Sequence, residues 1–263
     1  MKRILIVCHD INSYKKVLQK GITVAQEMNV GSTVLFIHET ELFNFFSKEE
    51  IFEKSRVTKQ IREYLRELDA EDTALLVEEG ASVDWVTQEL ARERNTLLIM
   101  DYLGSLTVDI LKHVSVNSLV LKEYTKNYTQ ALITTESTQP ANCLQVTKSF
   151  TKSISLYMDS LLVPVPIVPT PMIDITGDMV NTELYEQMLA ENKEQFQNFC
   201  EKEGIDCSFG SYDDVLSLNI IAATKEKGAD LLVLIPTDTT SILYGALSDI
   251  LEKATTDTLL CFE

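Results

Sequence analysis

Residues 3–9 read RILIVCH, an apolar run without the polar alternation of a half-exposed strand. Such a run is typical of a strand buried on both faces, as in a parallel sheet. Asn12 and Ser13 then offer caps for a helix, and apolar residues recur at helical spacing until Gly31. This opening segment therefore predicts a buried strand followed by a helix, which is the start of an α/β unit.

Strands and helices continue to alternate along the first half of the chain. The alternation predicts a parallel sheet with helices on both faces and right-handed crossovers. Five strands make a sheet of ordinary size. After the first strand we predict strands at 33–38, 74–80, 96–101 and 116–122, and helices at 47–69, 82–94 and 105–113.

The same order of elements begins again in the second half. A repeated element order points to a duplicated unit. We therefore predict two tandem domains, residues 1–126 and 127–263, each an α/β domain with a five-stranded parallel sheet. In the second domain the predicted strands are 129–135, 156–165, 205–212, 229–236 and 257–263, and the predicted helices are 138–153, 181–203, 214–227 and 241–253.

A proline-rich insertion at 164–171 breaks the symmetry of the two halves. Proline disfavours helix and favours an extended chain. Two interpretations stay open, a stiff surface loop and a lid or strap for a partner. The four prolines that follow the second strand of the second domain are Pro164, Pro166, Pro169 and Pro171.

The composition is that of a globular protein, with 45% hydrophobic and 24% charged residues. No apolar run reaches the roughly 20 residues that a membrane span needs, and the N-terminal run is too short for a signal peptide. We therefore expect a cytoplasmic protein without a membrane partner. The five cysteines are scattered, and even Cys200 and Cys207 have Gly204 between them, so we expect neither a disulfide nor a metal site.

The net charge of −17 is unevenly distributed along the chain. Residues 1–126 contain 16 basic and 20 acidic residues, giving −4, and residues 127–263 contain 7 and 20, giving −13. Such a surface repels the phosphates of nucleic acid, so we expect no nucleic-acid partner. The asymmetry also indicates that the two halves have diverged.

Several stretches, taken in order, resemble the universal stress protein family. Residues 5–12, LIVCHDIN, are similar to the family's opening strand, I-L-V-A-V-D-G-S. Residues 97–100, LLIM, and 104–120, GSLTVDILKHVSVNSLV, are similar to its closing strand, glycine loop and helix. Residues 226–235, EKGADLLVLI, and 245–254, GALSDILEKA, repeat this similarity in the second half. The resemblance covers nearly the whole chain and implies a tandem, Rossmann-like fold of the adenine nucleotide alpha hydrolase type, packed as a pseudo-dimer.

In nucleotide-binding members of the family, an aspartate after the first strand contacts adenosine. A Gly-x2-Gly-x9-Gly-Ser/Thr loop then holds the phosphates through its backbone N–H groups and a helix N-terminus. The ligand of such a sheet lies beyond the carboxyl ends of the strands. The resemblance implies candidate nucleotide-binding positions at Val7, Asp10, Gly104, Ser105, Glu136 and Gly245.

Both halves depart from this phosphate-binding pattern. Only three residues separate Met100 from Gly104, too few to wrap a triphosphate, and Asp101 adds a negative charge there. In the second half Glu136 stands where the aspartate is expected, and Gly245 is followed by alanine instead of serine. We therefore expect a non-enzymatic protein with a regulatory or stress-related role and a degenerate ATP site. The alternative is a sensor that binds ATP, AMP or a related metabolite.

The histidines offer a further, catalytic interpretation. His9 precedes Asp10 and His38 precedes Glu39, each at a predicted strand end, so a histidine and a carboxylate could form an acid–base pair. Polar residues at strand ends more often mark only where the chain leaves the core. The sequence contains no G-x-S-x-G, P-loop or H-E-x-x-H motif, so an enzyme is not the leading expectation.

The last strand of each half suggests how the chain associates. In this family the last strands pair across a two-fold axis, and residues 116–122 and 257–263 are short and rich in apolar residues. We expect these two strands to pair within the chain, which protects both edges. A higher homo-oligomer stays open at this point.

Overall fold

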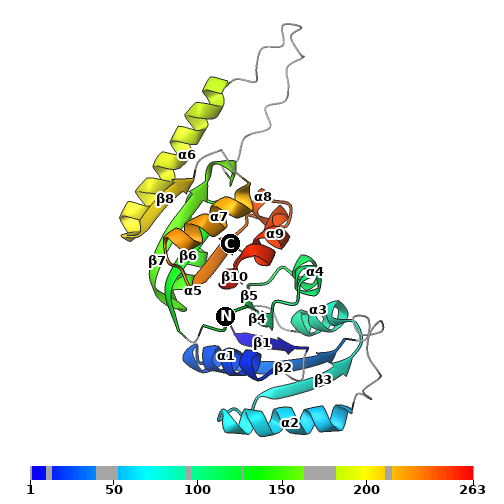
Figure 1. Ribbon diagram of the computed structural model, residues 1–263. Helices are drawn as coiled ribbons and strands as arrows, with labels where there is room; N and C mark the ends of the chain where they lie inside the picture. Colours follow the sequence, from blue (N-terminus) through cyan, green and yellow to red (C-terminus); the bar gives the residue numbers. More distant parts are fainter. Residues whose placement is uncertain are drawn as a thin grey trace, which may run out of the picture.

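The computed structural model describes residues 2–9, 14–39, 53–92, 96–125, 127–162, 182–210 and 215–262. Its strands form one ten-stranded sheet in the order β3-β2-β1-β4-β5-β10-β9-β6-β7-β8 (Figure 1). The predicted fold class, two five-stranded α/β units in tandem, is confirmed. The strands are β1 (Arg3–Cys8), β2 (Gly31–His38), β3 (Ala74–Glu79), β4 (Thr96–Asp101), β5 (Ser118–Leu121), β6 (Tyr128–Thr135), β7 (Thr151–Asp159), β8 (Asp206–Gly210), β9 (Leu231–Ile235) and β10 (Asp257–Leu260).

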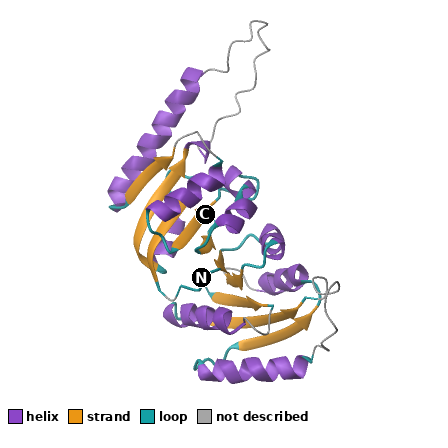
Figure 2. Ribbon diagram, viewed as in Figure 1, coloured by secondary structure: helices purple, strands orange, loops and turns teal. Residues whose placement is uncertain are grey.

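Helices cover both faces of this sheet, which twists between the two halves (Figure 2). One face is covered by α1 (Tyr14–Glu27), α2 (Lys54–Glu67), α5 (Ala141–Lys148) and α6 (Thr182–Glu203). The other face is covered by α3 (Ser82–Arg92), α4 (Ser105–His113), α7 (Leu216–Glu226), α8 (Ile242–Gly245) and α9 (Leu247–Lys253). A short 3-10 turn, η1 (Ser160–Leu162), follows β7.

The apolar runs explain why both faces are covered. In β1 the side chains of Ile4 and Ile6 pack into the cluster on one face, and those of Leu5 and Val7 pack into the cluster on the other. All four are fully buried. Each cluster also draws residues from both halves of the chain, so the two α/β units share one apolar layer on each side of the sheet.

The boundaries predicted around Ser149 are wrong. The helix predicted at 138–153 ends at Lys148, because Ser149 and Phe150 turn the chain through hydrogen bonds to Val146 and Thr147. β7 therefore begins at Thr151, five residues earlier than predicted, in register with Tyr128.

The helix predicted at 241–253 is divided into α8 and α9 at Ala246.

The proline-rich insertion lies outside the described residues, as do the expected helix caps Asn12 and Ser13. Among the described helices, none combines the length and the apolar character that crossing a membrane requires.

The two halves meet at the centre of the sheet, where β5 pairs with β10. This is the antiparallel pair of the sheet, whereas the other neighbouring strands run parallel. Leu119 faces Leu259, and both are fully buried. An antiparallel contact between the last strands of two similar units creates an approximate two-fold axis, so the halves are packed as a pseudo-dimer.

A buried aspartate holds the connection between the halves. Asp257 is 0% exposed and begins β10. Its Oδ1 accepts hydrogen bonds from the backbone N–H groups of Lys122, Glu123 and Tyr124, at 2.7, 2.9 and 3.2 Å. Its Oδ2 accepts hydrogen bonds from the N–H of Thr125 at 3.2 Å and from the hydroxyl of Tyr128 at 2.8 Å.

The same arrangement recurs in weaker form on the other side of the pseudo-two-fold axis. Asn117 lies two residues before Leu119, just as Asp257 lies two residues before Leu259. The Asn117 Oδ1 accepts a hydrogen bond of 3.0 Å from the N–H of Phe262, the second residue after β10. Each side chain therefore fixes the segment that leaves the opposite central strand.

We expect Asp257→Asn to lower the free energy of unfolding by about 2–4 kcal/mol, because the new amide group cannot accept the hydrogen bonds of Thr125 and Tyr128. Urea denaturation at pH 7 measures this loss. Asp72→Asn, at an exposed position, is the matched control and should stay within about 0.5 kcal/mol of wild type. A loss below about 1 kcal/mol for Asp257→Asn would contradict the assigned role.

Candidate functional site

The candidate site of the first half lies at the carboxyl edge of β1 and β4, as expected for an open parallel sheet. Val7 is fully buried in β1 between Leu35 and Met100, so it supports the floor of this edge. Gly104 is the N-cap of α4 and has a φ of 62°, a conformation that glycine adopts without strain. Ser105 follows as the exposed first residue of α4. Asp10 lies outside the described residues.

The loop between β4 and α4 is short and is held by hydrogen bonds to the first turn of α4. The hydroxyl of Thr107 accepts a hydrogen bond of 2.7 Å from the N–H of Leu103 and donates one of 3.0 Å to the carbonyl of Asp101. A phosphate-binding loop needs backbone N–H groups that point freely toward the ligand. The Leu103 N–H already donates to Thr107, so this loop has fewer free N–H donors for a phosphate than the family's longer glycine loop.

The carboxylate of Asp101 occupies the end of β4 in the same place. It is 8% exposed, and the hydroxyl of Tyr124 donates a hydrogen bond to its Oδ1. Burial, together with this hydrogen bond, raises the pKa of Tyr124. Tyr124 itself belongs to the segment held by Asp257. The connection between the halves thus places a tyrosine ring and a carboxylate beside the first half's site.

His9, Ser82 and Glu39 form a polar cluster at this edge. His9 follows β1, Glu39 follows β2 and Ser82 begins α3. The Nε2 of His9 lies 2.9 Å from the Oγ of Ser82. Ser82 also donates both its hydroxyl and its backbone N–H to the Oε2 of Glu39, the latter at 2.8 Å.

This cluster places Ser82 between His9 and the carboxylate of Glu39, so these two groups do not form a direct acid–base pair. Asp10, the carboxylate next to His9 in the sequence, lies outside the described residues. The hydroxyl proton of Ser82 is directed to Glu39, and His9 Nε2 must therefore donate to Ser82. A base that activates a serine has to accept that proton instead. Ser82 and Glu39 are also only 1% and 3% exposed, which keeps substrate away from them.

The proton arrangement leaves one atom of His9 unused. With the proton on Nε2, Nδ1 is an acceptor, and it is buried without a hydrogen-bond partner among the described residues. Burial lowers the pKa of His9 to about 4, against the opposing effect of Glu39, so the ring is neutral at pH 7. Sequence reasoning missed Ser82 as a site residue, although its position at the start of a predicted helix placed it at this edge.

In the second half a carboxylate from the protein fills the centre of the candidate site. Glu136 follows β6 and is 8% exposed. Its Oε2 accepts hydrogen bonds from the N–H and hydroxyl of Thr237, at 2.9 and 3.1 Å. Its Oε1 accepts one of 2.8 Å from the N–H of Leu243 at the start of α8. The donors at both ends of the β9–α8 loop therefore point at the side chain of Glu136.

The strand register corrects the predicted equivalence of Glu136. Leu119 and Leu259 face each other, and they pair with Ile99 and Val233, respectively. These residues in turn pair with Ile6 and Ile133. Glu136, three residues after Ile133, is thus the counterpart of His9, and Ser137 is the counterpart of Asp10.

Gly245 also differs from its predicted role. It closes α8 and is exposed, whereas Gly104 starts a helix. A methyl group added to Gly245 would meet no atom within 4 Å, so nothing in the backbone requires glycine at this position. Glu136 and Gly245 therefore do not form a phosphate-binding pair like the one the resemblance implies.

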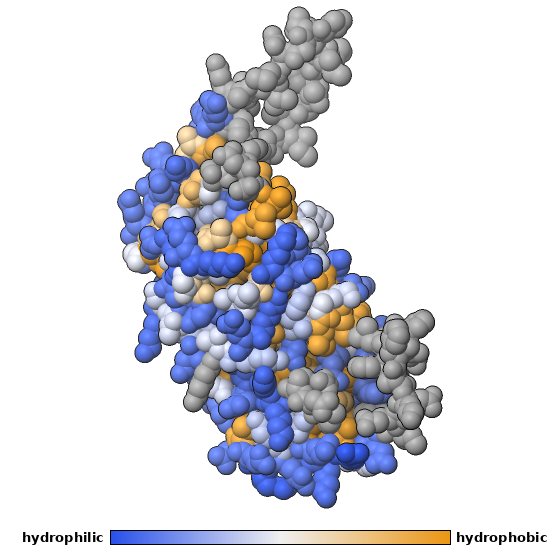
Figure 3. Space-filling model, viewed as in Figure 1, coloured by the Kyte–Doolittle hydropathy of each residue, from blue (hydrophilic) through white to orange (hydrophobic). Residues whose placement is uncertain are grey.

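The carboxyl edge of the second half also exposes apolar side chains. Val215 precedes α7, Leu218 lies in its first turn and Ile242 begins α8; they are 59%, 47% and 59% exposed. Figure 3 shows hydrophobic residues gathered in patches on an otherwise mostly hydrophilic face. Apolar groups at this edge do not favour a triphosphate, which binds through hydrogen-bond donors and cations.

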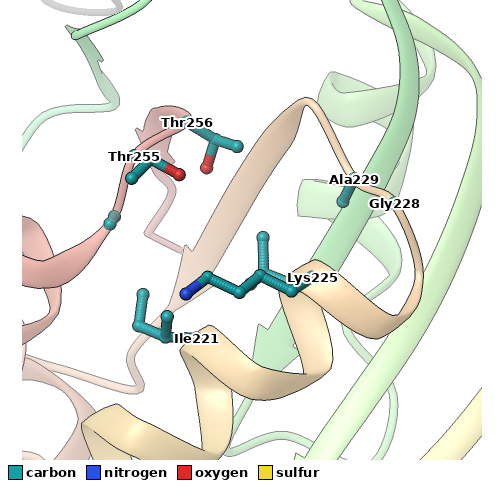
Figure 4. Close-up of a pocket in the computed structure, with 8 residues that line it drawn as sticks. Ile221, Lys225, Gly228, Ala229, Thr255 and Thr256 are labelled. Carbon is teal, nitrogen blue, oxygen red and sulfur yellow. The ribbon is translucent and has the colours of Figure 1, made fainter.

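A small cavity lies at the opposite, amino edge of the second half (Figure 4). It measures about 110 Å³, and Lys225 reaches from α7 toward the hydroxyl groups of Thr255 and Thr256. The helices α7 and α9 end beside it, and helix C-termini favour cations over anions. The cavity is therefore a poor site for phosphate, in spite of the lysine. The described residues also contain no group of three or more potential metal ligands.

We expect acid to destabilise the protein through His9. Its pKa is about 4 when folded and 6.5 when unfolded, so the proton binds the unfolded chain more tightly. The stability is complete above pH 6.5 and falls as the pH drops toward 4. His9→Gln should remove about 2 kcal/mol of the loss that wild type shows between pH 7 and pH 5 in urea denaturation.

His113→Gln, at an exposed position, is the control for His9 and should keep the wild-type pH dependence. If His9→Gln and wild type lose the same free energy between pH 7 and pH 5, His9 is not the titrating group.

We expect Glu136→Ala to lower the free energy of unfolding by about 1–3 kcal/mol, because the N–H groups of Thr237 and Leu243 lose their acceptor. Added sulfate should stabilise this variant more than it stabilises wild type, since a free anion replaces the carboxylate. Thermal melts over a sulfate series measure both effects, with Glu226→Ala as the exposed control. An equal sulfate response in all three proteins would refute the anion-like role of Glu136.

Comparison with known proteins places this geometry in a structural class. No protein-family model and no curated protein sequence matches the chain. Solved structures do match: a proposed universal stress protein from Pseudomonas aeruginosa UCBPP-PA14 has a TM-score of 0.65 at 13% identity, covering 100% of this chain and 93% of that one. A protein of unknown function from Pseudomonas aeruginosa PAO1 has a TM-score of 0.64 at 12% identity, covering 100% and 92%. A universal stress protein from Archaeoglobus fulgidus has a TM-score of 0.63 at 13% identity, covering 99% and 96%. Over its whole length, this chain has the fold of the universal stress proteins.

Proposed function

We propose that this chain is a non-enzymatic, cytoplasmic tandem universal stress-like protein with a regulatory or stress-related role, in which the ATP site is degenerate in both halves. It acts through its surface and through the packing of its two halves. The protein carries a net charge of −17, so its partners are proteins or small molecules instead of nucleic acid.

The observation that carries this proposal is the position of Glu136. Its carboxylate accepts hydrogen bonds from the N–H groups of Thr237 and Leu243. These N–H groups are the donors that a phosphate would need in the second half. A buried carboxylate with three hydrogen bonds is a strongly held internal anion. A nucleotide phosphate would have to displace it and would meet its charge.

The first half supports the same proposal by a different route. The Tyr124 hydroxyl and the Asp101 carboxylate lie together at the end of β4. The loop that follows is held by the Thr107 hydroxyl. A triphosphate at this edge would meet a negative charge and a short loop, with no glycine before Gly104.

The His9 cluster supports the non-enzymatic part of this proposal. Its serine and carboxylate are buried, and His9 donates to Ser82 instead of accepting from it. Buried polar clusters that satisfy one another stabilise a fold more often than they catalyse a reaction. The cluster therefore acts as a structural tie between β1, β2 and α3.

One observation favours a second candidate function, a sensor of an adenine nucleotide or a related metabolite. The Nδ1 of His9, at the carboxyl edge of the first half, is an acceptor for which the described part of the chain supplies no hydrogen-bond donor. At the same edge, Gly104 and Ser105 keep the last two positions of the family's phosphate motif. A ligand that supplies one donor and little charge would fit this edge better than ATP.

Ligand tests on the purified protein separate the two candidates. For the degenerate site we expect no nucleotide in the supernatant of the unfolded protein, measured by ion-exchange chromatography. Binding of ATP would stabilise the folded state by mass action and raise the melting temperature. For the degenerate site we therefore expect no such rise with millimolar ATP and Mg²⁺. A rise that depends on concentration, and that Ser105→Ala or His9→Gln weakens, would support the sensor instead.

A further inference from the structure

Two cysteines of the second half lie against each other where α6 meets β8. Cys200 is in the last turn of α6, and Cys207 is the second residue of β8. Between them Gly204, with a φ of 66°, ends the helix and reverses the chain. The N–H of Ile205 then donates a hydrogen bond of 2.9 Å to the carbonyl of Cys200. This tight turn brings the start of β8 back along the end of α6.

The turn brings the side chains of Cys200 and Cys207 to the same face of the sheet, where the two thiols interact with each other. Both cysteines are free. They pack against the same apolar cluster on this face of the sheet. The sequence alone suggested no such contact, because a glycine between two cysteines breaks the helix that would otherwise carry them.

The two thiols differ in their access to solvent. Cys200 is 1% exposed, whereas Cys207 is partly exposed on β8. β8 is an outer strand of the ten-stranded sheet, with β7 as its neighbour. An oxidant from solution therefore reaches Cys207 first and finds a second thiol directly behind it.

We propose that Cys200 and Cys207 form a reversible disulfide on reaction with hydrogen peroxide or an organic hydroperoxide. The pair is thus an oxidative modification site that ties the end of α6 to β8. Cys207 is the thiol that the oxidant attacks, and Cys200 is the resolving thiol. This site is separate from the candidate nucleotide edge and does not depend on the proposed function.

The reaction balances in two steps. The thiolate of Cys207 attacks one peroxide oxygen, the O–O bond breaks, and the products are a sulfenic acid at Cys207 and a water or alcohol molecule. The sulfur of Cys200 then attacks the sulfur of Cys207, the S–S bond forms, and the S–O bond breaks. The leaving hydroxide takes the proton of Cys200 and becomes water. Both thiols are oxidised, and one peroxide is reduced.

The buried environment of Cys200 suits it to the second step, the attack on the sulfenic acid of Cys207. Burial, and then the hydrogen bond with Cys207, raise its pKa to about 12. A thiol of this kind forms little thiolate at neutral pH and does not react first with peroxide. It reacts only with a sulfur held beside it, where proximity compensates for its low thiolate fraction.

The experiment uses the full chain, treated with a small excess of hydrogen peroxide and then with an alkylating reagent. Peptide mass spectrometry without reduction should show Cys200 linked to Cys207, and a reductant should restore both thiols. Cys207→Ser should abolish the linkage. Cys200→Ala should leave a sulfenic acid at Cys207 that dimedone traps.

Cys143→Ser is the matched control, since Cys143 is equally buried in the same cluster, and it should leave the linkage intact. Circular dichroism checks that each variant is folded, and Cys200→Ser is a second variant at that position. The proposal is overturned if wild-type Cys207 oxidises to the sulfinic acid while Cys200 stays reduced. It is also overturned if Cys207 resists peroxide under conditions that oxidise other cysteines of the folded chain.

Discussion

The antiparallel contact between β5 and β10 is the constraint on which the rest of the structure depends. Each half alone would present its last strand as an unpaired edge, which is a site for association with other chains. Pairing the two edges within one chain makes a continuous sheet and lets each apolar layer extend across both halves. The contact also sets the approximate two-fold axis that relates His9 to Glu136.

Asp257 connects this central pair to the candidate site of the first half. Its carboxylate holds the backbone of 122–125, and that segment presents Tyr124 to Asp101 at the end of β4. Lys20 of α1 reinforces the segment through a 2.7 Å hydrogen bond to the carbonyl of Thr125. The junction of the halves and the carboxyl edge of the first half are therefore connected by hydrogen bonds.

In the proposed degenerate site, the two halves disfavour a phosphate group by different means. The second half supplies its own anion, since Glu136 takes the N–H groups at both ends of the β9–α8 loop. The first half shortens the loop and places Asp101 beside it. The two solutions share a physical result, because each puts a carboxylate where a phosphate group would be attracted by free donors.

The sequence by itself determined the fold class, because buried parallel strands leave continuous apolar runs and helices leave a 3.6-residue period. It also identified Asp101 as a charge unsuited to phosphate, and it placed Glu136 at the position of the family's aspartate. It could not supply the register that relates Glu136 to His9, the place of Ser82 between His9 and Glu39, or the contact of Cys200 with Cys207. Each of these depends on which strand ends and turns meet in space, and side chains distant in sequence carry no local pattern that records such contacts.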